Sequence, residues 1–587
     1  MKFKYQGNLK YSNEINNILK DEFTPGDLAT QLKKENLNVE ENLNLIIKES
    51  KPIIKATFGE GYWEDHFTYL DDIIDSIESI YPDKIDDIVF NNQNYLIYNS
   101  GVYVKPRIEK HVLTKDLKVR QYEAIKHNDK TSDWLTNKNN EVIKTNLIGK
   151  LLTLIVNKYA HLDPLGIGLS YEANKPGWND AMNGLPGLFA SGVSETVELL
   201  KNVRRVKKYL LEFNNKRVYL LNSTNNFIKM ITKIKQEDDF KTWDLRMTLL
   251  EEYRLELENN NHELIETSFN EYNDFINKVE TDLEKAVSKA KELNEIIPTY
   301  LTYEVADYEK LNKFNERGEE LVKVKSFKLK PIASFLEAPA RYIKTTNNKE
   351  DVKKLYKAVK DSELYDNKFK FYKTSVDLTN ETHEIGRIHA FTKGWLERES
   401  NFLHMTYKYI LGLLSAGLYD EFYEEIKTNY ICFMDPEVYG RSPLENSTFI
   451  APSNNPDKTK HGQGFVARLT GSTAEFLSMW HKMFFGNKLF SYVNNELVFT
   501  IAPKLNKMFF KDSRVKTTLF SNIEVEIINK DNINTYDLDA VIEKIVLFDK
   551  ELGEKTFDGA IVTGNWVQKI RQKSIYKISV YIKKEEK

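Results

Sequence analysis

The chain has 587 residues, of which 41% are hydrophobic and 12% aromatic, so it has enough apolar material for more than one folded unit. Its 84 basic and 87 acidic residues nearly balance and form no long run of one sign, which argues against a nucleic-acid surface. The single cysteine, Cys432, excludes an internal disulfide framework and a multi-cysteine metal site, and it suits a reducing compartment.

We interpret residues 1–50 as an extension or linker ahead of the main fold. The opening residues lack the apolar core of a secretion signal, and apolar runs such as residues 410–418 are too short to cross a bilayer. We therefore expect a cytoplasmic protein that binds neither membranes nor nucleic acid.

Helical periodicity dominates from about residue 60 to 485. In residues 63–81 the apolar side chains recur at three- and four-residue spacing, which predicts a helix with one buried stripe. Four further helices are expected, at residues 146–160, 194–213, 403–426 and 473–485. Helices that alternate with long loops predict a mainly α fold, and we assign residues 51–485 to an (α/α)6 toroid or barrel.

The sequence changes character twice along the chain. Residues 225–295 are dense in charge and lack glycine and proline, so we interpret them as a solvated helical insertion in the barrel. Near the C-terminus the apolar period becomes two, with Ile523, Val525 and Ile527 on one face of a first strand and Ile578, Val580 and Ile582 on one face of a second. A small antiparallel β domain is therefore expected over residues 486–587.

Glycine is concentrated in one loop. Six of the 25 glycines fall between Gly166 and Gly192, around the tripeptide Trp178-Asn179-Asp180. Because glycine allows sharp turns and lets a ligand come close to the backbone, this loop is the first place to expect chemistry.

Four stretches combine aromatic and polar residues in a way that a core does not need: residues 58–66, 175–184, 395–404 and 461–476. A sugar site needs an aromatic platform, polar groups that pair the hydroxyls, and a carboxylic acid at the glycosidic oxygen. Three tryptophan and carboxylate pairs supply this combination, namely Trp63 with Asp65, Trp178 with Asp180, and Trp395 with Glu397.

The last of these stretches also predicts an anion site. Ser472 and Glu475 have the spacing of a capping box, which predicts a helix start with Thr470 and Gly471 just ahead of it. Free amides, a hydroxyl and a glycine at a helix start bind anions readily.

Each of these features also has a purely structural explanation. Trp178 could be a core residue followed by an ordinary Asn-Asp turn, and the box at Ser472 could merely cap a helix. Asp65 is favoured in the first turn of a helix by the macrodipole, and His404 lies among apolar residues, as a core histidine does. The functional interpretation gains weight because the four stretches occur together.

Taken together, the stretches resemble the inverting glycoside phosphorylases of glycoside hydrolase family 94, the cellobiose phosphorylase group, and their larger relatives that phosphorolyse β-glucans. "GWNDAMNG" is similar to the family segment whose aspartate is the general acid, which implies this role for Asp180. The similarity of "GYWEDHFTYLDDI", "ERESNFLHMTYKYILGLLSAGLYDEFYEEI" and "LTGSTAEFLSMW" to other family segments implies that Asp65 and Glu397 bind the donor sugar and that His404, Thr470 and Gly471 bind phosphate. Trp178, in the segment of the acid, would shape the subsite that binds the sugar.

The resemblance implies cleavage of a β-glucosidic bond by inorganic phosphate, with inversion, to give an α-sugar 1-phosphate without a metal or other cofactor. The substrate would be a β-linked gluco-oligosaccharide. The chain departs from the cellobiose enzymes at Leu396, where they have a lysine, and near residue 60, where it lacks their sugar-binding arginine. Two other functions remain open, an inverting hydrolase with Glu397 or Glu445 as base and a non-catalytic carbohydrate-binding half of a split enzyme.

Members of this family carry a large β-sandwich region ahead of the barrel, whereas about 60 residues precede the first predicted barrel helix here. We therefore expect the C-terminal part of a longer enzyme. It would form a homo-oligomer, or take a partner chain that supplies the N-terminal β region, through the barrel face left uncovered.

Overall fold

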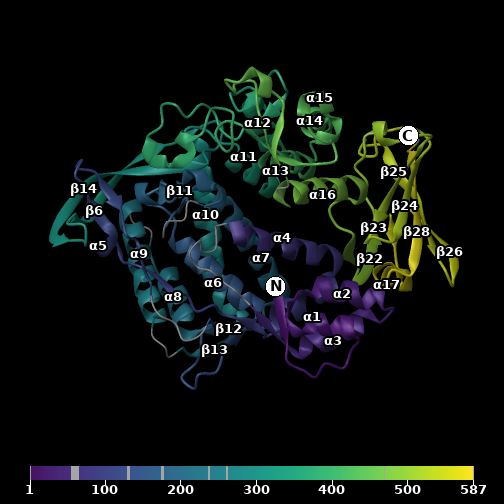
Figure 1. Ribbon diagram of the computed structural model, residues 1–587, viewed down its shortest axis with the longest axis horizontal. Coiled ribbons are helices and arrows are strands. Elements are labelled where there is room, and N and C mark those ends of the chain that lie inside the picture. Colours follow the sequence, from purple (N-terminus) through teal and green to yellow (C-terminus); the bar gives the residue numbers. More distant parts are fainter. Residues whose placement is uncertain are drawn as a thin grey trace. The chain divides into compact units, whose positions relative to one another are not determined.

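The N-terminal residues form a short strand and a group of helices (Figure 1), which enclose a small core of their own. The computed structural model describes residues 2–53, 65–127, 133–172, 177–235, 238–258, 262–467 and 470–585, and it divides after Gly61 into a small and a large unit. In the small unit, β1 (Lys2–Tyr5) pairs antiparallel with both β2 (Glu22–Phe23) and β3 (Ser50–Ile53).

Three helices complete the small unit: α1 (Asn13–Lys20), α2 (Pro25–Lys34) and α3 (Val39–Lys48). Each begins after a side-chain cap, Ser12, Thr24 or Asn38, which accepts a hydrogen bond from the backbone N–H three residues later. The buried residues are Ile15, Leu19, Phe23, Leu28, Leu32 and Ile46. Residues 2–53 therefore hold a core that is separate from that of the large unit.

The five helices expected from periodicity are present in the large unit. They are α4 (Asp65–Ile80), α6 (Leu147–Ala160), α7 (Val193–Phe213), the pair α13 (Leu403–Ser415) and α14 (Tyr419–Asn429), and α16 (Thr470–Phe485). α6 illustrates why these segments are helical: Asn146 caps its start by accepting a hydrogen bond from the Gly149 N–H, and nine of its residues are buried. The stretch expected at 403–426 is interrupted by a turn between α13 and α14.

Helices of the large unit pack in succession. α7 contacts α10 (Asn273–Leu293) and α11 (Glu337–Thr345), α11 contacts α13, and α13 contacts α16. The charge-dense residues 225–295 form most of α8 (Asn222–Thr232), α9 (Asp239–Leu257), β13 (Leu264–Ser268) and α10. Trp243 and Leu250 of α9 and Ile276 of α10 are buried in the main core, so these helices are part of the packed body.

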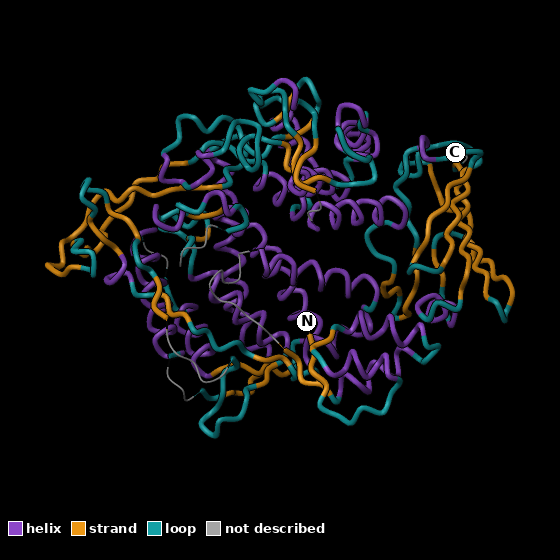
Figure 2. The backbone as a smooth tube through the Cα atoms, in the orientation of Figure 1, coloured by secondary structure: helices purple, strands orange, loops and turns teal. Residues whose placement is uncertain are grey.

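The expectation of a mainly α barrel followed by a small β domain is wrong. The described residues are 43% helical and 25% strand, and Figure 2 shows strands throughout the large unit, not only near the C-terminus. Six strands form one curled sheet in the order β10-β11-β14-β15-β6-β7. Its long hairpin, β14 (Tyr300–Phe314) with β15 (Glu320–Pro331), was not expected from the sequence.

This sheet holds both ends of the glycine-rich loop. β10 (Leu169–Ser170) and β11 (Ser191–Gly192) pair with each other, and β11 also pairs with β14. At the other edge β15 pairs with β6 (His111–Leu113), and β6 pairs with β7 (Val119–Gln121). The loop around Trp178 therefore starts and ends on neighbouring strands.

The C-terminal region is rich in strands, as expected, but it is not purely antiparallel. A five-stranded sheet has the order β23-β24-β28-β25-β26, from β23 (Arg514–Leu519), β24 (Ile523–Asn529), β25 (Ala540–Asp549), β26 (Gly553–Asp558) and β28 (Ile575–Lys584). Its central pair, β24 and β28, is parallel. Ile523, Val525 and Ile527 are fully buried, which confirms that the alternating residues face a core.

Shorter elements complete the large unit. The helices are α5 (Arg107–Lys110), α12 (Lys349–Lys360), α15 (Pro436–Tyr439) and α17 (Asn565–Arg571), and the strands are β4 (Tyr95–Leu96), β5 (Val102–Val104), β8 (Ile125–His127), β9 (Lys144–Thr145), β12 (Arg217–Leu221), β16 (Tyr365–Asp366), β17 (Phe371–Tyr372), β18 (Asn401–Phe402), β19 (Ser447–Ile450), β20 (Gly464–Ala467), β21 (Phe490–Val493), β22 (Glu496–Thr500) and β27 (Ile561–Val562). Among the helices of the described segments, none combines the length and the apolar character that a membrane span requires.

Candidate functional site

A row of stacked aromatic rings joins two of the predicted stretches. Strands β18, β19 and β20 form a small sheet in which Phe402 pairs with Phe449, and Phe449 with Phe465. The ring centroids of these two pairs are 4.6 and 5.4 Å apart with nearly parallel planes. Cross-strand aromatic pairs of this kind stabilise a sheet, so this sheet is a stable support for the side chains packed on it.

Both ends of this row are tryptophans predicted from the sequence. Trp178 stacks on Phe402 with centroids 4.9 Å apart, and Trp395 stacks on Phe465 at 3.7 Å with an angle of 5° between the planes. Each tryptophan is only partly buried. The row therefore brings the segments of Asp180 and Glu397 to the same small sheet.

Asp180 begins a short 3-10 turn, Asp180–Met182, in the glycine-rich loop. The buried Asn179 side chain accepts a hydrogen bond from the Ala181 N–H and thereby caps this turn. The Asp180 carboxylate is 45% exposed, and its Oδ2 accepts a hydrogen bond from Nη2 of Arg387 at 2.6 Å. The carboxylate is therefore reachable from solvent and held in place by a cation.

Arg387 is a site residue that the sequence analysis missed. It begins a second 3-10 turn, Arg387–Ala390, and its backbone N–H donates to Oδ1 of Asn183, which lies three residues after Asp180. The preceding Gly386 has φ +131°, a conformation that side-chain-bearing residues rarely adopt. A glycine followed by arginine and, two residues later, histidine was the available signal in the sequence.

Glu397 lies in a tight turn in which Trp395 and Arg398 form a β-bridge. Leu396, which precedes Glu397, has a φ of +54°, and Glu399, two residues after it, has a φ of +57°. Such a backbone conformation costs free energy for residues other than glycine and is typical of functional sites. Burial raises the pKa of Glu397, and the negative charge of Asp180 raises it further. The two carboxyl groups thus share one electrostatic environment.

His404 and Gly471 also meet, as the sequence predicts for a shared site. His404 on α13 is buried, and its ring makes an edge contact with Trp178, with centroids 6.0 Å apart. A methyl group added at Gly471 would lie 2.5 Å from the His404 ring, so only glycine leaves room for it. The imidazole therefore lies against the first turn of α16.

An ion pair borders this contact. Glu475 of α16 lies 2.9 Å from Nζ of Lys408 and 3.7 Å from Nε2 of His404. Burial lowers the pKa of His404, which keeps the imidazole neutral near neutral pH with one N–H to donate. Burial alone would raise the pKa of Glu475, but the charge of Lys408 and a hydrogen bond from His404 hold it well below its usual range.

The predicted capping box is not formed as expected. α16 begins at Thr470, so Ser472 lies inside the helix and is fully buried, and Thr470 and Gly471 belong to the first turn. Glu475 pairs with Lys408 on another helix. The start of α16 is therefore three residues earlier than the box predicts.

The other predicted residues are only partly accounted for. Asp65 is the first residue of α4, but its side chain, like that of Thr470 and the whole of Trp63, lies outside the described residues. Glu445, the other candidate base, pairs with Arg441 at 3.3 Å.

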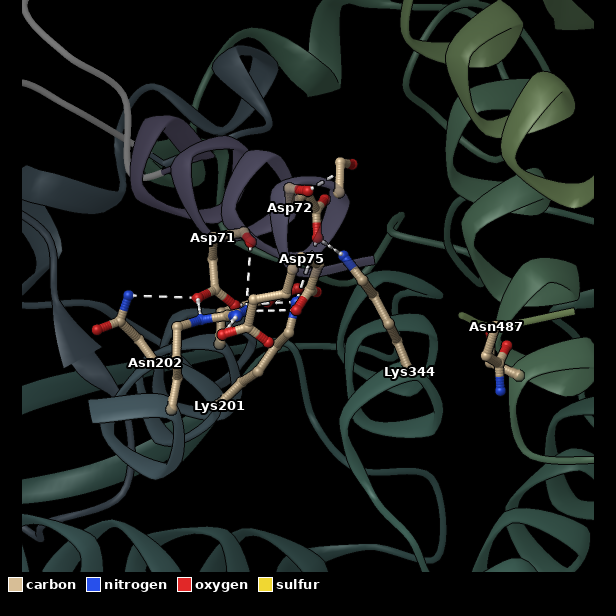
Figure 3. A network of polar contacts seen from close by, with 12 residues as sticks. Asp71, Asp72, Asp75, Lys201, Asn202, Lys344 and Asn487 are labelled. Atoms are coloured by element: carbon tan, nitrogen blue, oxygen red, sulfur yellow. Dashed lines mark hydrogen bonds and ion pairs between the residues drawn. The ribbon is translucent and has the colours of Figure 1, made fainter. Parts of the chain in front are cut away.

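A network of ion pairs, in which Asp71 is buried and Asp75 is exposed, fixes the helix that Asp65 begins. Figure 3 shows Asp71, Asp72 and Asp75 of α4 facing cations from α7 and α11. Nζ of Lys201 lies 2.9, 3.2 and 2.7 Å from the three carboxylates, and Nζ of Lys344 lies 2.6 Å from Asp72. Because each helix contributes charges to the others, α4, α7 and α11 cannot shift independently.

Replacing Gly471 with alanine tests the contact with His404. The added Cβ would overlap the buried imidazole, so we expect the free energy of unfolding to fall by about 1–3 kcal/mol. Urea denaturation measures it. Gly187→Ala is the matched control, because its Cβ would meet nothing nearer than 3.8 Å, and it should unfold like the wild type. Equal stability of the Gly471→Ala variant would show that His404 does not pack on this turn.

Comparisons with known proteins add no identification: no protein-family model matches the chain, and no curated protein matches it. The function is therefore inferred from the site formed by Trp178, Asp180, Arg387, Glu397 and His404.

Proposed function

We propose that the chain is an inverting glycoside phosphorylase, which cleaves a β-glucosidic bond with inorganic phosphate and releases an α-sugar 1-phosphate. One observation supports this most: three stretches far apart in the sequence meet, since Trp178 contacts His404, Asp180 acts on the pKa of Glu397, and Gly471 packs on His404. The proposal depends on this site and on the family resemblance of its segments, and not on the overall fold.

Asp180 is the general acid in this proposal. Asp180 takes up a proton from solvent before the reaction and passes it to the glycosidic oxygen as the bond from that oxygen to the anomeric carbon breaks, while the proton of the attacking hydrogen phosphate is released to solvent. The acid thereby becomes a carboxylate, and the guanidinium of Arg387 at 2.6 Å stabilises the negative charge that develops there. Arg387 also fixes the direction in which the carboxyl group points.

Inorganic phosphate supplies the nucleophile. An oxygen of the phosphate forms the new bond to the anomeric carbon on the face opposite the leaving group, so no second carboxylate is needed to activate water. By the family resemblance His404 contacts this anion, and the first turn of α16 offers backbone N–H groups beside it. By the family resemblance, Thr470 adds a hydroxyl to the same anion.

Glu397 and Asp65 bind hydroxyl groups of the donor sugar in this proposal, and Trp178 shapes the subsite. An aromatic ring beside carboxylates suits a sugar, because the ring covers the C–H face while the oxygens pair the hydroxyls. A partly buried Glu397 beside a strained backbone suits such a fixed contact. The single cysteine agrees with a reducing cytoplasm as the place of the reaction.

A release assay over a panel of β-linked gluco-oligosaccharides tests the function. Formation of an α-sugar 1-phosphate that stops in phosphate-free buffer is the expected result. Sugar release that does not depend on phosphate would instead identify an inverting hydrolase. Oligosaccharide binding without any turnover would point to a non-catalytic binding protein.

His404→Gln is expected to raise the KM for phosphate more than the KM for the oligosaccharide. A hydrogen bond to a charged partner contributes about 1.5–3 kcal/mol, which corresponds to about 10- to 150-fold. Initial rates over a grid of both substrate concentrations separate the two constants.

His481→Gln is the control, because His481 is a partly buried histidine on α16 itself and packs on Phe485. It should leave both constants unchanged. An equal rise of both constants in the His404→Gln variant would place this histidine in general packing instead of at phosphate.

A further inference from the structure

A polar pocket lies between α9 and α10, and it shares no residue with the candidate site. Its polar lining recurs at three- and four-residue spacing along each helix, so the side chains of each helix share one face. This lysine pocket is lined by Asp239 and Arg246 of α9 and by Lys278, Asp282, Lys285 and Lys289 of α10, with the loop at Gly166 closing one side.

Positive charge is in excess in the lysine pocket. It holds four cationic side chains and two carboxylates, a surplus of two positive charges. Asp239 pairs with Lys289 at 3.0 Å, and Asp282 pairs with Lys278 at 3.4 Å and accepts a hydrogen bond from the Tyr159 hydroxyl at 2.5 Å. Both carboxylates are therefore already engaged by the protein's own donors.

Arg246 gives the pocket a buried donor. Its side chain is 4% exposed, and its Nη2 donates to the backbone carbonyl of Leu162 at 2.9 Å. Within the described part of the chain, its Nε is buried and has no hydrogen-bond acceptor. Leaving a buried donor unpaired is unfavourable, so an acceptor atom in the pocket would stabilise this arrangement.

We propose that the lysine pocket binds a phosphoryl dianion, either inorganic phosphate or the phosphate end of a sugar phosphate. Such a group carries the two negative charges that the surplus calls for and several strong acceptor oxygens for Arg246 and the lysines. The fork of a guanidinium and the mobile heads of lysines are the usual ligands of phosphate in proteins. The inference stands on this pocket alone and is independent of the proposed catalytic function.

Calorimetric titration of the whole chain with phosphate tests the pocket. The titration is done in the His404→Gln background, which weakens the proposed catalytic phosphate site, and at constant ionic strength. Adding Lys278→Met and Lys285→Met should weaken binding about tenfold or more, because two cationic donors are lost. The control pair Lys353→Met and Lys357→Met, two exposed lysines of α12, should leave the affinity unchanged.

Separate titrations with inorganic phosphate, glucose 1-phosphate and glucose identify the source of the phosphoryl group. Phosphate-dependent protection of Lys278, Lys285 and Lys289 from acetylation, read by mass spectrometry, gives a second measurement on the unsubstituted chain. Binding by only one of the phosphates would show which source is right. Equal affinity in the pocket and control variants, together with unchanged acetylation, would overturn the proposal.

Discussion

Asp180→Asn is expected to slow phosphorolysis of unactivated β-glucosides by about 10²–10⁴-fold, the usual contribution of a general acid. The asparagine keeps the size of the side chain and a carbonyl oxygen that can accept from Arg387, which lies 2.6 Å from the aspartate. It has no acidic proton to transfer to the leaving group. Because the position is 45% exposed, the fold should remain intact. Initial rates with a β-linked oligosaccharide and phosphate measure the effect.

Two comparisons make this result specific. A nitrophenyl β-glucoside has a leaving group that needs no proton, so the Asp180→Asn variant should regain much of the lost rate on it. Asp86→Asn removes an aspartate of another ion pair, with Lys216 at 2.6 Å and similar exposure, and should not affect the rate. Near-normal turnover of an unactivated oligosaccharide by the Asp180→Asn variant would show that Asp180 is not the acid.

The helices and strands with a clean apolar period could be predicted from the sequence. α6 has nine buried residues among fourteen, and Val525 and Val580 lie on the buried faces of their strands. In each case one face of the element contacts the core along its whole length, so apolar residues recur in the sequence with the period of the helix or strand. Local periodicity is enough when the environment of an element is uniform along its length.

The hairpin of β14 and β15 could not be found in this way. The first four residues of β14 are buried, whereas most of the remainder is exposed, so the strand shows no constant alternation of apolar and polar residues. In α9 the buried set includes Thr242 and Arg246 beside Trp243, which hides the apolar stripe behind polar residues. β14 and β15 pair with each other, but the strands on either side of them, β11 and β6, come from far away in the chain, so the sheet was not expected and the barrel prediction failed.

Much of the candidate site could be predicted, because it consists of unusual residues close together in the sequence. Trp178 with Asp180, and Trp395 with Glu397, lie two positions apart, and the structure brings both pairs to the row of phenylalanines. Arg387 could not be predicted in the same way, since only the folded chain brings it to Asp180 across 207 positions. The glycine, arginine and histidine near this position do not by themselves indicate which residue Arg387 contacts.

A buried ion cluster holds the start of the site loop, and Glu172 is at its centre. Its side chain is 8% exposed and lies 2.8 Å from Nζ of Lys110, 2.7 Å from Nη2 of Arg254 and 3.0 Å from Nε2 of His161. Burial alone would raise the pKa of Glu172, but the charges of Arg254 and Lys110 outweigh it and hold the pKa well below its usual range. The carboxylate is therefore ionised in the folded protein.

Glu172→Gln is expected to lower the free energy of unfolding by about 3–5 kcal/mol, because it leaves the buried Lys110 without a counter-charge. Urea denaturation of the large unit measures this. The stabilisation by Glu172 is present above its unfolded-state pKa and is lost as the pH falls toward its lower folded-state pKa, so the difference from wild type should narrow below about pH 4. As a control, Glu309→Gln breaks the exposed ion pair of Glu309 with Lys325 and should change the free energy of unfolding little.

Adding Lys110→Met to Glu172→Gln should restore part of the stability, since the uncompensated cation is then removed. If the single and double variants are equally unstable, packing around Glu172 matters more than its charge.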